Sequence, residues 1–129
     1  MNSETFTVAE AAKAAGIEAG RIRGWLQHRH IAFGTRGRTG RYRFTKRDVR
    51  CLTLMATLID HGIETTLAAK HAATIVDRSA GWKRAPLAAV VSHDPVVSPM
   101  LVPQDAVTPA ESFVLVNLVP LFARLEAAA

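Results

Sequence analysis

The stretch "TVAEAAKAAGIEAGRIRGWLQHRH", residues 7–30, carries the signals for two short helices separated by a glycine turn. Thr7 followed three residues later by Glu10 is a capping box, and the alanine-rich run after it favours a helix that stops at Gly16. A second short helix is expected at roughly 19–28. Two short helices joined by a few residues around a glycine form a helix-turn-helix.

The second helix has two contrasting faces. On a helical wheel its apolar face is made by Ile22, Trp25 and Leu26. The opposite face contains Gly20, Gly24, Gln27 and His28, flanked by Arg21 and Arg23. Each glycine costs about 1 kcal/mol in a helix interior, so this helix would be unstable alone. What the glycines provide is a smooth outer surface that another backbone can approach closely.

The segment "GTRGRTGRYRFT", residues 34–45, combines four arginines with three glycines. We expect a hairpin with strands at 31–33 and 41–44, joined by a turn-rich connector at 34–40. Because side chains alternate along a strand, Tyr42 and Phe44 would face inward, with Arg41 and Arg43 facing outward. The alternative is an unstructured basic tract, but a solvated linker does not require aromatic residues to alternate with arginines. The pattern therefore predicts a structured wing.

The net charge of +5 is distributed unevenly. Residues 1–84 carry 15 Lys and Arg against 7 Asp and Glu, a net +8, whereas 85–129 carry 1 against 4, a net −3. A dense basic cluster repels itself unless it is solvated or meets a polyanion, which makes double-stranded DNA the expected partner. An acidic membrane surface is the other possibility. Basic membrane helices, however, place Lys and Arg opposite a broad apolar face, and these arginines lie among glycines.

Two further helices are expected after the wing. Thr45 and Asp48 form a second capping-box-like start, for a helix that ends near Gly62. Its apolar side takes up more than half of the circumference, so we expect neighbours on two sides; the residues are Val49, Cys51, Leu52, Met55, Ala56, Leu58 and Ile59. Another helix is expected at about 65–78, with His71 on its surface.

The C-terminal part is different in character. It contains all six prolines of the chain and no heptad pattern. We expect short strands near 88–91, 96–102 and 112–118, and a final helix near 120–128. The run "FVLVNL" is expected to be buried, and Trp82 to fill the junction with the preceding helices. The expected fold is therefore mainly α with a small β component: a winged helix-turn-helix domain at 1–78 and a strand-containing appendage at 79–129. The appendage is expected to pack on the first domain, on a copy of itself or on a protein partner.

The order of these parts resembles the winged helix-turn-helix domain of the MerR family of bacterial transcriptional regulators. The likeness covers roughly residues 5–76 and rests on short pieces in a shared order: Thr7, Ala11, Gly16, Ile17, Ile22, Arg23, Phe44, Thr45, Asp48, Val49, Leu52, Gly62 and Ile63. The resemblance implies a helix in the major groove and a wing against the phosphates. Typical members continue into a long coiled coil, which makes the dimer, and an effector pocket; this chain has no heptads for that coil.

The residue types predict how the DNA would be read. Base reading is expected from Arg21, Arg23, Gln27 and His28, and phosphate contacts from the wing. The resemblance also implies a DNA contact for Arg23, and contact with the DNA backbone for Trp25, where the family usually has Tyr. The complete predicted interface is Arg21, Arg23, Trp25, Gln27, His28, Arg36, Arg38, Arg41, Tyr42 and Arg43.

The sequence departs from the family pattern at three places. Glu18 stands where the family has a Ser or Thr N-cap, and Gly24 where it has an aromatic residue. The wing arginine is displaced by one position, which leaves open whether Arg41 or Arg43 makes the family's phosphate contact.

Other classes of function find little support in the residues. No apolar run approaches the roughly 20 residues of a membrane span, and the N-terminus lacks a secretory signal pattern. His28 and His30 are the only close histidine pair, without a cysteine or carboxylate to complete a metal site, and Cys51 fits a core position. No catalytic constellation is present. We expect a cytoplasmic, nucleoid-associated protein that is not an enzyme and uses no metal or cofactor.

The leading hypothesis is a sequence-dependent DNA-binding transcriptional regulator that acts as a homodimer or assembles side by side on DNA. One alternative is an excisionase-like architectural factor of phage type, which bends DNA for recombination. The other is an adaptor that docks a protein partner through its C-terminal segment.

Overall fold

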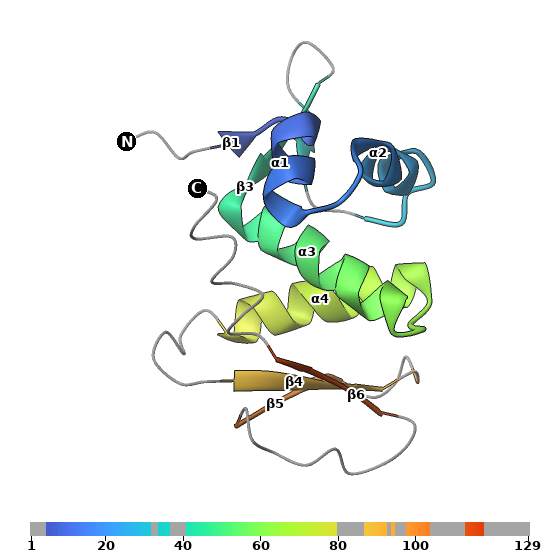
Figure 1. Ribbon diagram of the computed structural model, residues 1–129, viewed down its shortest axis with the longest axis vertical. Coiled ribbons are helices and arrows are strands. Elements are labelled where there is room, and N and C mark those ends of the chain that lie inside the picture. Colours follow the sequence, from blue (N-terminus) through green and yellow to red (C-terminus); the bar gives the residue numbers. More distant parts are fainter. Residues whose placement is uncertain are drawn as a thin grey trace.

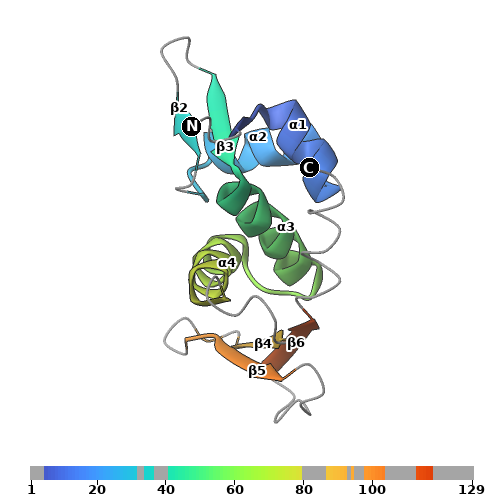
Figure 2. The same cartoon turned by 90° about the vertical axis from the view of Figure 1, so that its left-hand side faces the viewer.

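The structure is a computed structural model that describes residues 5–31, 34–36, 41–79, 87–92, 94, 98–103 and 113–117. Within these residues the helices are α1 (Val8–Ala15), α2 (Ala19–Gln27), α3 (Lys46–Asp60) and α4 (Thr65–Ser79). The strands are β1 (Thr5–Phe6), β2 (Thr35–Arg36), β3 (Tyr42–Thr45), β4 (Leu87–Ser92), β5 (Met100–Pro103) and β6 (Phe113–Asn117). Figures 1 and 2 show them in layers: α2 lies against α1, α1 against α3, α3 against α4, and the β4–β6 sheet lies beyond α4. The expected mainly α fold with a small β component is confirmed.

Both predicted helix starts are confirmed as capping boxes. The backbone N–H of Glu10 donates to Oγ1 of Thr7 at 3.1 Å, and the N–H of Thr7 donates to Oε1 of Glu10 at 3.0 Å. The same exchange joins Thr45 and Asp48 at the start of α3, at 2.9 and 3.1 Å. These bonds satisfy N–H groups that a helix terminus would otherwise leave unpaired. Gly16 ends α1 with φ 71°, the left-handed conformation expected of a glycine there.

The wing forms as a hairpin, but its first strand is not where the sequence pattern placed it. Strand β2 begins after Gly34, inside the predicted connector, and pairs with β3 through Thr35–Arg43 and Arg36–Tyr42. The prediction of a strand at 31–33 was wrong at Ile31, which is buried but not in a strand; the next two residues lie outside the described part. Gly34 has φ 100°, and this bend interrupts extended backbone, so that pairing starts only beyond it.

Strand β3 has a second partner that the sequence did not predict. Strand β1 pairs with it on the other side, through Thr5–Thr45 and Phe6–Phe44, so the strand order is β1-β3-β2. The predicted alternation along β3 is confirmed, because Phe44 is fully buried and Tyr42 half-buried, whereas Arg41 and Arg43 are exposed.

Helix α3 is the centre of the hydrophobic core. Its completely buried side chains include Leu52, Leu54, Met55 and Leu58, each at 0% exposure. Leu52 and Leu54 lie on opposite sides of the helix, which confirms that it is covered on two sides, by α1 and by α4. Each such side chain contributes roughly 1.5–3 kcal/mol on burial. Cys51 also lies in this core, and burial raises the pKa of its thiol to about 12.

The outer layer packs on α4 and corrects one prediction. Ala89 and Val91 of β4 and Val116 of β6 belong to the same buried cluster as the helices. His71, expected on the helix surface, is 2% exposed, and its Nε2 donates to the backbone carbonyl of Ser92 at 3.2 Å. The helix pattern alone gave no sign that a sheet covers this side of α4.

The predicted C-terminal strands are present, with one shifted. Strand β4 pairs antiparallel with both β5 and β6, in the order β5-β4-β6. Strand β5 begins at Met100 rather than near residue 96, directly after Pro99, which has no N–H to donate to a ladder. Trp82 and the expected helix at 120–128 lie outside the described residues, and the division of the chain at residue 78 stays a prediction.

Replacing Gly34 by alanine should destabilise the fold by about 1–3 kcal/mol. A Cβ at this position would lie 2.8 Å from Cε1 of Phe44, on a backbone with φ 100° that L-residues rarely adopt. Urea unfolding measures the change. The matched control is Gly20→Ala, since a Cβ there meets nothing within 4 Å. Equal stability of the two variants would contradict the close Gly34–Phe44 packing.

The stability of the protein should fall in mild acid because of His71. Burial lowers the pKa of its imidazole, with a smaller effect of Lys70 in the same direction, while the bond to Ser92 opposes the shift. The unfolded chain therefore takes up a proton near pH 6.5 that the folded chain resists, so the free energy of unfolding decreases as the pH drops below about 6.5.

Urea unfolding between about pH 7.5 and pH 5 measures this slope. In His71→Gln the slope should be shallower, since the amide can still donate to Ser92 without titrating. The exposed His61→Gln serves as control and should behave as the wild type. Identical profiles for His71→Gln and the wild type would show that His71 does not contribute.

Candidate nucleic-acid interface

Helix α2 presents a polar face to solvent and an apolar face to the core. Ile22 is 0% exposed and Trp25 6%, whereas Arg23, Gln27 and His28 are exposed. At its start, Glu18 makes no side-chain capping bond, as the missing Ser or Thr led us to expect. The orientation of α2 therefore comes from its buried face and not from an N-cap.

The glycines of α2 lie on the outward side. A Cβ built at Gly20 or at Gly24 would meet no atom within 4 Å. Neither residue is therefore required by packing inside the described fold. Each leaves the helix backbone accessible to a partner, as the sequence predicted.

Arg21 is attached to its own fold. Its Nη2 lies 3.4 Å from Oδ1 of Asp60, the last residue of α3, and its guanidinium carbon lies 5.3 Å from the Trp25 ring centroid. The Arg21 side chain is 37% exposed. This arrangement joins α2 to the C-terminal end of α3. Trp25 itself is 6% exposed, and its contact with the DNA backbone stays a prediction.

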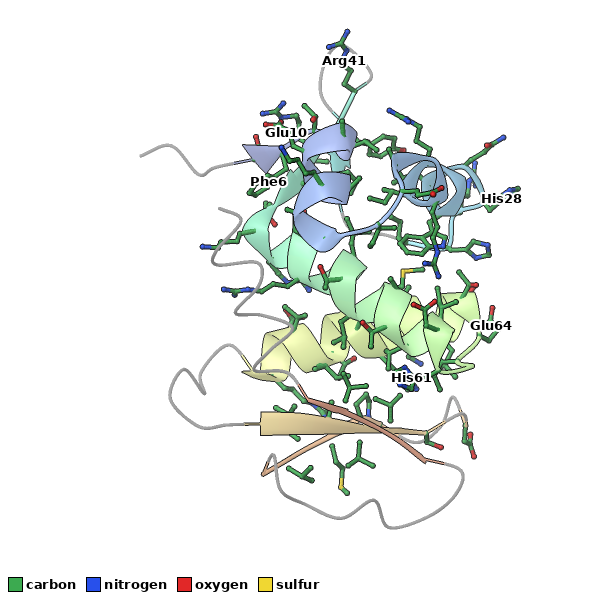
Figure 3. All side chains as sticks on the ribbon, in the orientation of Figure 1. Phe6, Glu10, His28, Arg41, His61 and Glu64 are labelled. Carbon is green, nitrogen blue, oxygen red and sulfur yellow. The ribbon has the colours of Figure 1, made fainter. Side chains whose placement is uncertain are left out.

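The two wing arginines differ in their surroundings. Arg43 lies across β1: its Nε and Nη2 donate to Oγ1 of Thr5 at 3.0 and 2.8 Å, and Nη2 also reaches the Thr5 carbonyl at 3.5 Å. Arg41 is exposed and has no hydrogen-bond or ion-pair partner among the described residues. In Figure 3, Arg41 stands at the top of the wing and His28 at the outer end of α2, both away from the β4–β6 sheet.

The acidic groups of the described helices are engaged within the scaffold. Hydrogen bonds from Thr7 lower the pKa of the Glu10 carboxyl. Asp77 accepts hydrogen bonds from Nε and Nη2 of Arg47 at 2.6 and 2.9 Å, which lowers its pKa. These contacts leave Arg23 and Arg41 without an anionic partner in the described part of the chain.

The remaining predicted residues are placed as follows. Tyr42 is half-buried beside Phe44, the side chain of Arg36 is not described, and Arg38 lies outside the described residues. The rings of His28 and His30 lie near each other, with centroids 6.0 Å apart. Among the described residues no three potential ligands gather into a metal site, and no helix is both long and apolar enough to cross a membrane.

Sequence reasoning missed the partners of the interface arginines. Thr5 and Asp60 hold Arg43 and Arg21, but they are 38 and 39 residues away along the chain. No local pattern marks such pairs. The sequence analysis also did not single out Arg29, an exposed cation two residues beyond the end of α2.

The family model described as MerR HTH family regulatory protein matches residues 6–73, more than half of the 129-residue chain. The chain belongs to the MerR family. The match begins in β1 and ends within α4, so it covers the helix-turn-helix, the wing and α3. The match identifies this region as the helix-turn-helix of the MerR HTH family of regulatory proteins.

Among solved structures, the MerR-family chain is similar to HiNmlR, described as a MerR family regulator lacking the sensor domain, bound to promoter DNA. The two are 28% identical, the similarity covers 62% of this chain and 62% of that chain, and the TM-score is 0.48. No curated protein is significantly similar. Neither the excisionase-like alternative nor the adaptor alternative receives support from these comparisons.

Alanine at Gly20 or Gly24 should stabilise the protein and weaken its binding to DNA. Each change favours helix α2 by up to about 1 kcal/mol, because alanine is the better helix former. The added methyl meets nothing in the fold. It would, however, stand between the α2 backbone and the DNA. Thermal unfolding and fluorescence anisotropy with labelled duplex DNA measure the two effects; greater stability with unchanged affinity would mean that this face does not approach DNA.

Proposed function

We propose that this MerR-family regulator places α2 in the major groove of double-stranded DNA and the wing against an adjacent phosphate backbone. The observation that carries the proposal is the exposure of Arg23 and Arg41 without partners in the described fold. A guanidinium that makes no internal contact is available for bases or phosphates. Nucleic acid supplies both kinds of acceptor.

The dimensions of α2 suit the major groove. With its side chains an α-helix is about 10–12 Å across, and the major groove, about 12 Å wide, admits one. The outward Gly20 and Gly24 allow the backbone to come close to the base edges. Arg23, Gln27 and His28 then read bases, with Arg suited to guanine and Gln to adenine.

The wing arginines have different proposed roles. Arg43 anchors the wing to β1 through Thr5, whereas Arg41 binds a phosphate. Arg36 and Arg38 would add phosphate contacts from the same hairpin. Arg21, held by Asp60 and Trp25, supports the orientation of α2 and adds positive potential beside the groove. We therefore assign the family's phosphate contact to Arg41, whereas the sequence alone left both Arg41 and Arg43 as candidates.

The test compares Arg41→Ala with Arg43→Ala in DNA binding over 50–200 mM salt. If the protein neutralises six or more phosphates, wild-type affinity should fall roughly a thousandfold over this range. Arg41→Ala should reduce the salt slope by about one and leave the melting temperature unchanged. Arg43→Ala should lower the melting temperature, because the wing loses its bonds to Thr5.

Lys70→Ala is the matched control, since it removes an exposed charge on α4, outside the proposed surface. Its affinity and salt slope should match the wild type. A wild-type affinity that does not respond to salt would contradict the proposed function. A normal salt slope in Arg41→Ala would instead contradict only the assignment of Arg41.

A further inference from the structure

Helix α2 ends in a backbone conformation that its sequence does not favour. Arg29 has φ 57°, the left-handed region, and is the only non-glycine residue of the described chain with a positive φ. The N–H of Arg29 donates to the carbonyl of Leu26 at 3.2 Å, and the N–H of His30 donates to that of Trp25 at 2.9 Å. This pair of bonds is a Schellman ending, whose left-handed position is usually occupied by glycine.

The strain at Arg29 has no compensation from contacts of its side chain. A side chain with a Cβ is disfavoured in the left-handed region because the Cβ crowds the following carbonyl. The guanidinium is exposed and makes no hydrogen bond or ion pair with any part of the chain that the structure describes. A cation near a helix C-terminus interacts favourably with the dipole, but a basic residue in the last turn would do this without left-handed backbone.

The neighbouring residues fix the position of the Arg29 backbone. On one side it follows α2, and on the other His30 is held by Thr66 of α4, with Nδ1 of His30 and Oγ1 of Thr66 3.0 Å apart. Ile31, the next residue, is 8% exposed and belongs to the core. The backbone at Arg29 is therefore anchored on both sides, while its side chain projects into solvent.

We propose that Arg29 binds a DNA phosphate at the edge of the groove that α2 occupies. This inference rests on the proposed function. In the proposed complex α2 lies in the groove with Arg23, Gln27 and His28 toward the bases. A residue just past its C-terminal end is then close to the sugar-phosphate backbone that borders the groove. A charged group at the end of a long side chain suits such a contact, and phosphate is the anion that duplex DNA presents there.

Arg29→Gly separates the effect of the left-handed backbone on stability from the effect of the charge on DNA binding. Glycine relieves the left-handed strain and removes the charge, so the melting temperature should rise while affinity falls about equally for all DNA sequences. Losing one phosphate contact lowers the slope of log affinity against log salt by about 0.9. The ratio of the wild-type affinity to the Arg29→Gly affinity should then decrease roughly threefold between 50 and 200 mM salt.

Arg29→Lys and Arg29→Asn complete the test. Lysine keeps the charge, so its salt slope should match the wild type; asparagine tolerates the left-handed conformation without charge and should behave in binding like Arg29→Gly. Lys70→Ala again controls for the loss of an exposed cation elsewhere. Affinities are measured by anisotropy on labelled duplexes of two unrelated sequences, with thermal unfolding of each variant.

The outcomes distinguish this inference from the proposed function. If the wild type binds DNA with a steep salt dependence and Arg29→Gly keeps both the affinity and the slope, Arg29 is only a helix end and the inference is overturned. Loss of binding to one duplex but not to the other would also overturn it, because it would indicate base reading. If the wild type shows no salt-dependent binding at all, the proposed function itself fails.

Discussion

Strand β3 is the constraint on which the rest of the surface depends. It lies between β1 and β2, its Phe44 is fully buried, and Thr45 immediately caps α3. Gly34 passes so close to the Phe44 ring that a Cβ there would lie 2.8 Å from Cε1 of the ring. The wing is thereby fixed to the central helix. Helix α1 contacts β3 and α3 and also packs against α2, so the position of the wing relative to α2 follows from this strand through α1.

Six arginines of the described chain form two groups by their contacts. Arg21, Arg43 and Arg47 are bound by Asp60, Thr5 and Asp77, and these contacts join elements of the scaffold. Arg23, Arg29 and Arg41 have no such partner in the described chain and are exposed. In the proposed complex the exposed arginines contact DNA, and the arginines with internal partners hold the scaffold that positions them. The basic composition thus has two physical functions, which net charge alone does not separate.

Signals that act over a few residues were predictable from the sequence. The capping boxes at Thr7 and Thr45, the glycine ending of α1 and the alternation around Phe44 all depend on neighbours within four residues. Together they were sufficient for the order of elements and for the resemblance to the MerR family.

Features that depend on distant parts of the chain were not predictable. Strand β1 has two residues, too few for a period, and exists because it pairs with β3. His71 looks like a surface residue on a helical wheel and is buried only because β4 covers it. The difference between Arg41 and Arg43 likewise comes from Thr5, 38 residues away. The strain at Arg29 is a backbone property that its residue type conceals.

The most direct test of one continuous DNA surface on α2 and the wing is an amide NMR titration of the full chain with a short, arbitrary duplex at low salt. The largest shifts are expected at Arg23, Gln27, His28, Arg29 and Arg41, with little change along β4. Shifts centred on β4, or shifts in α2 without any in the wing, would contradict it.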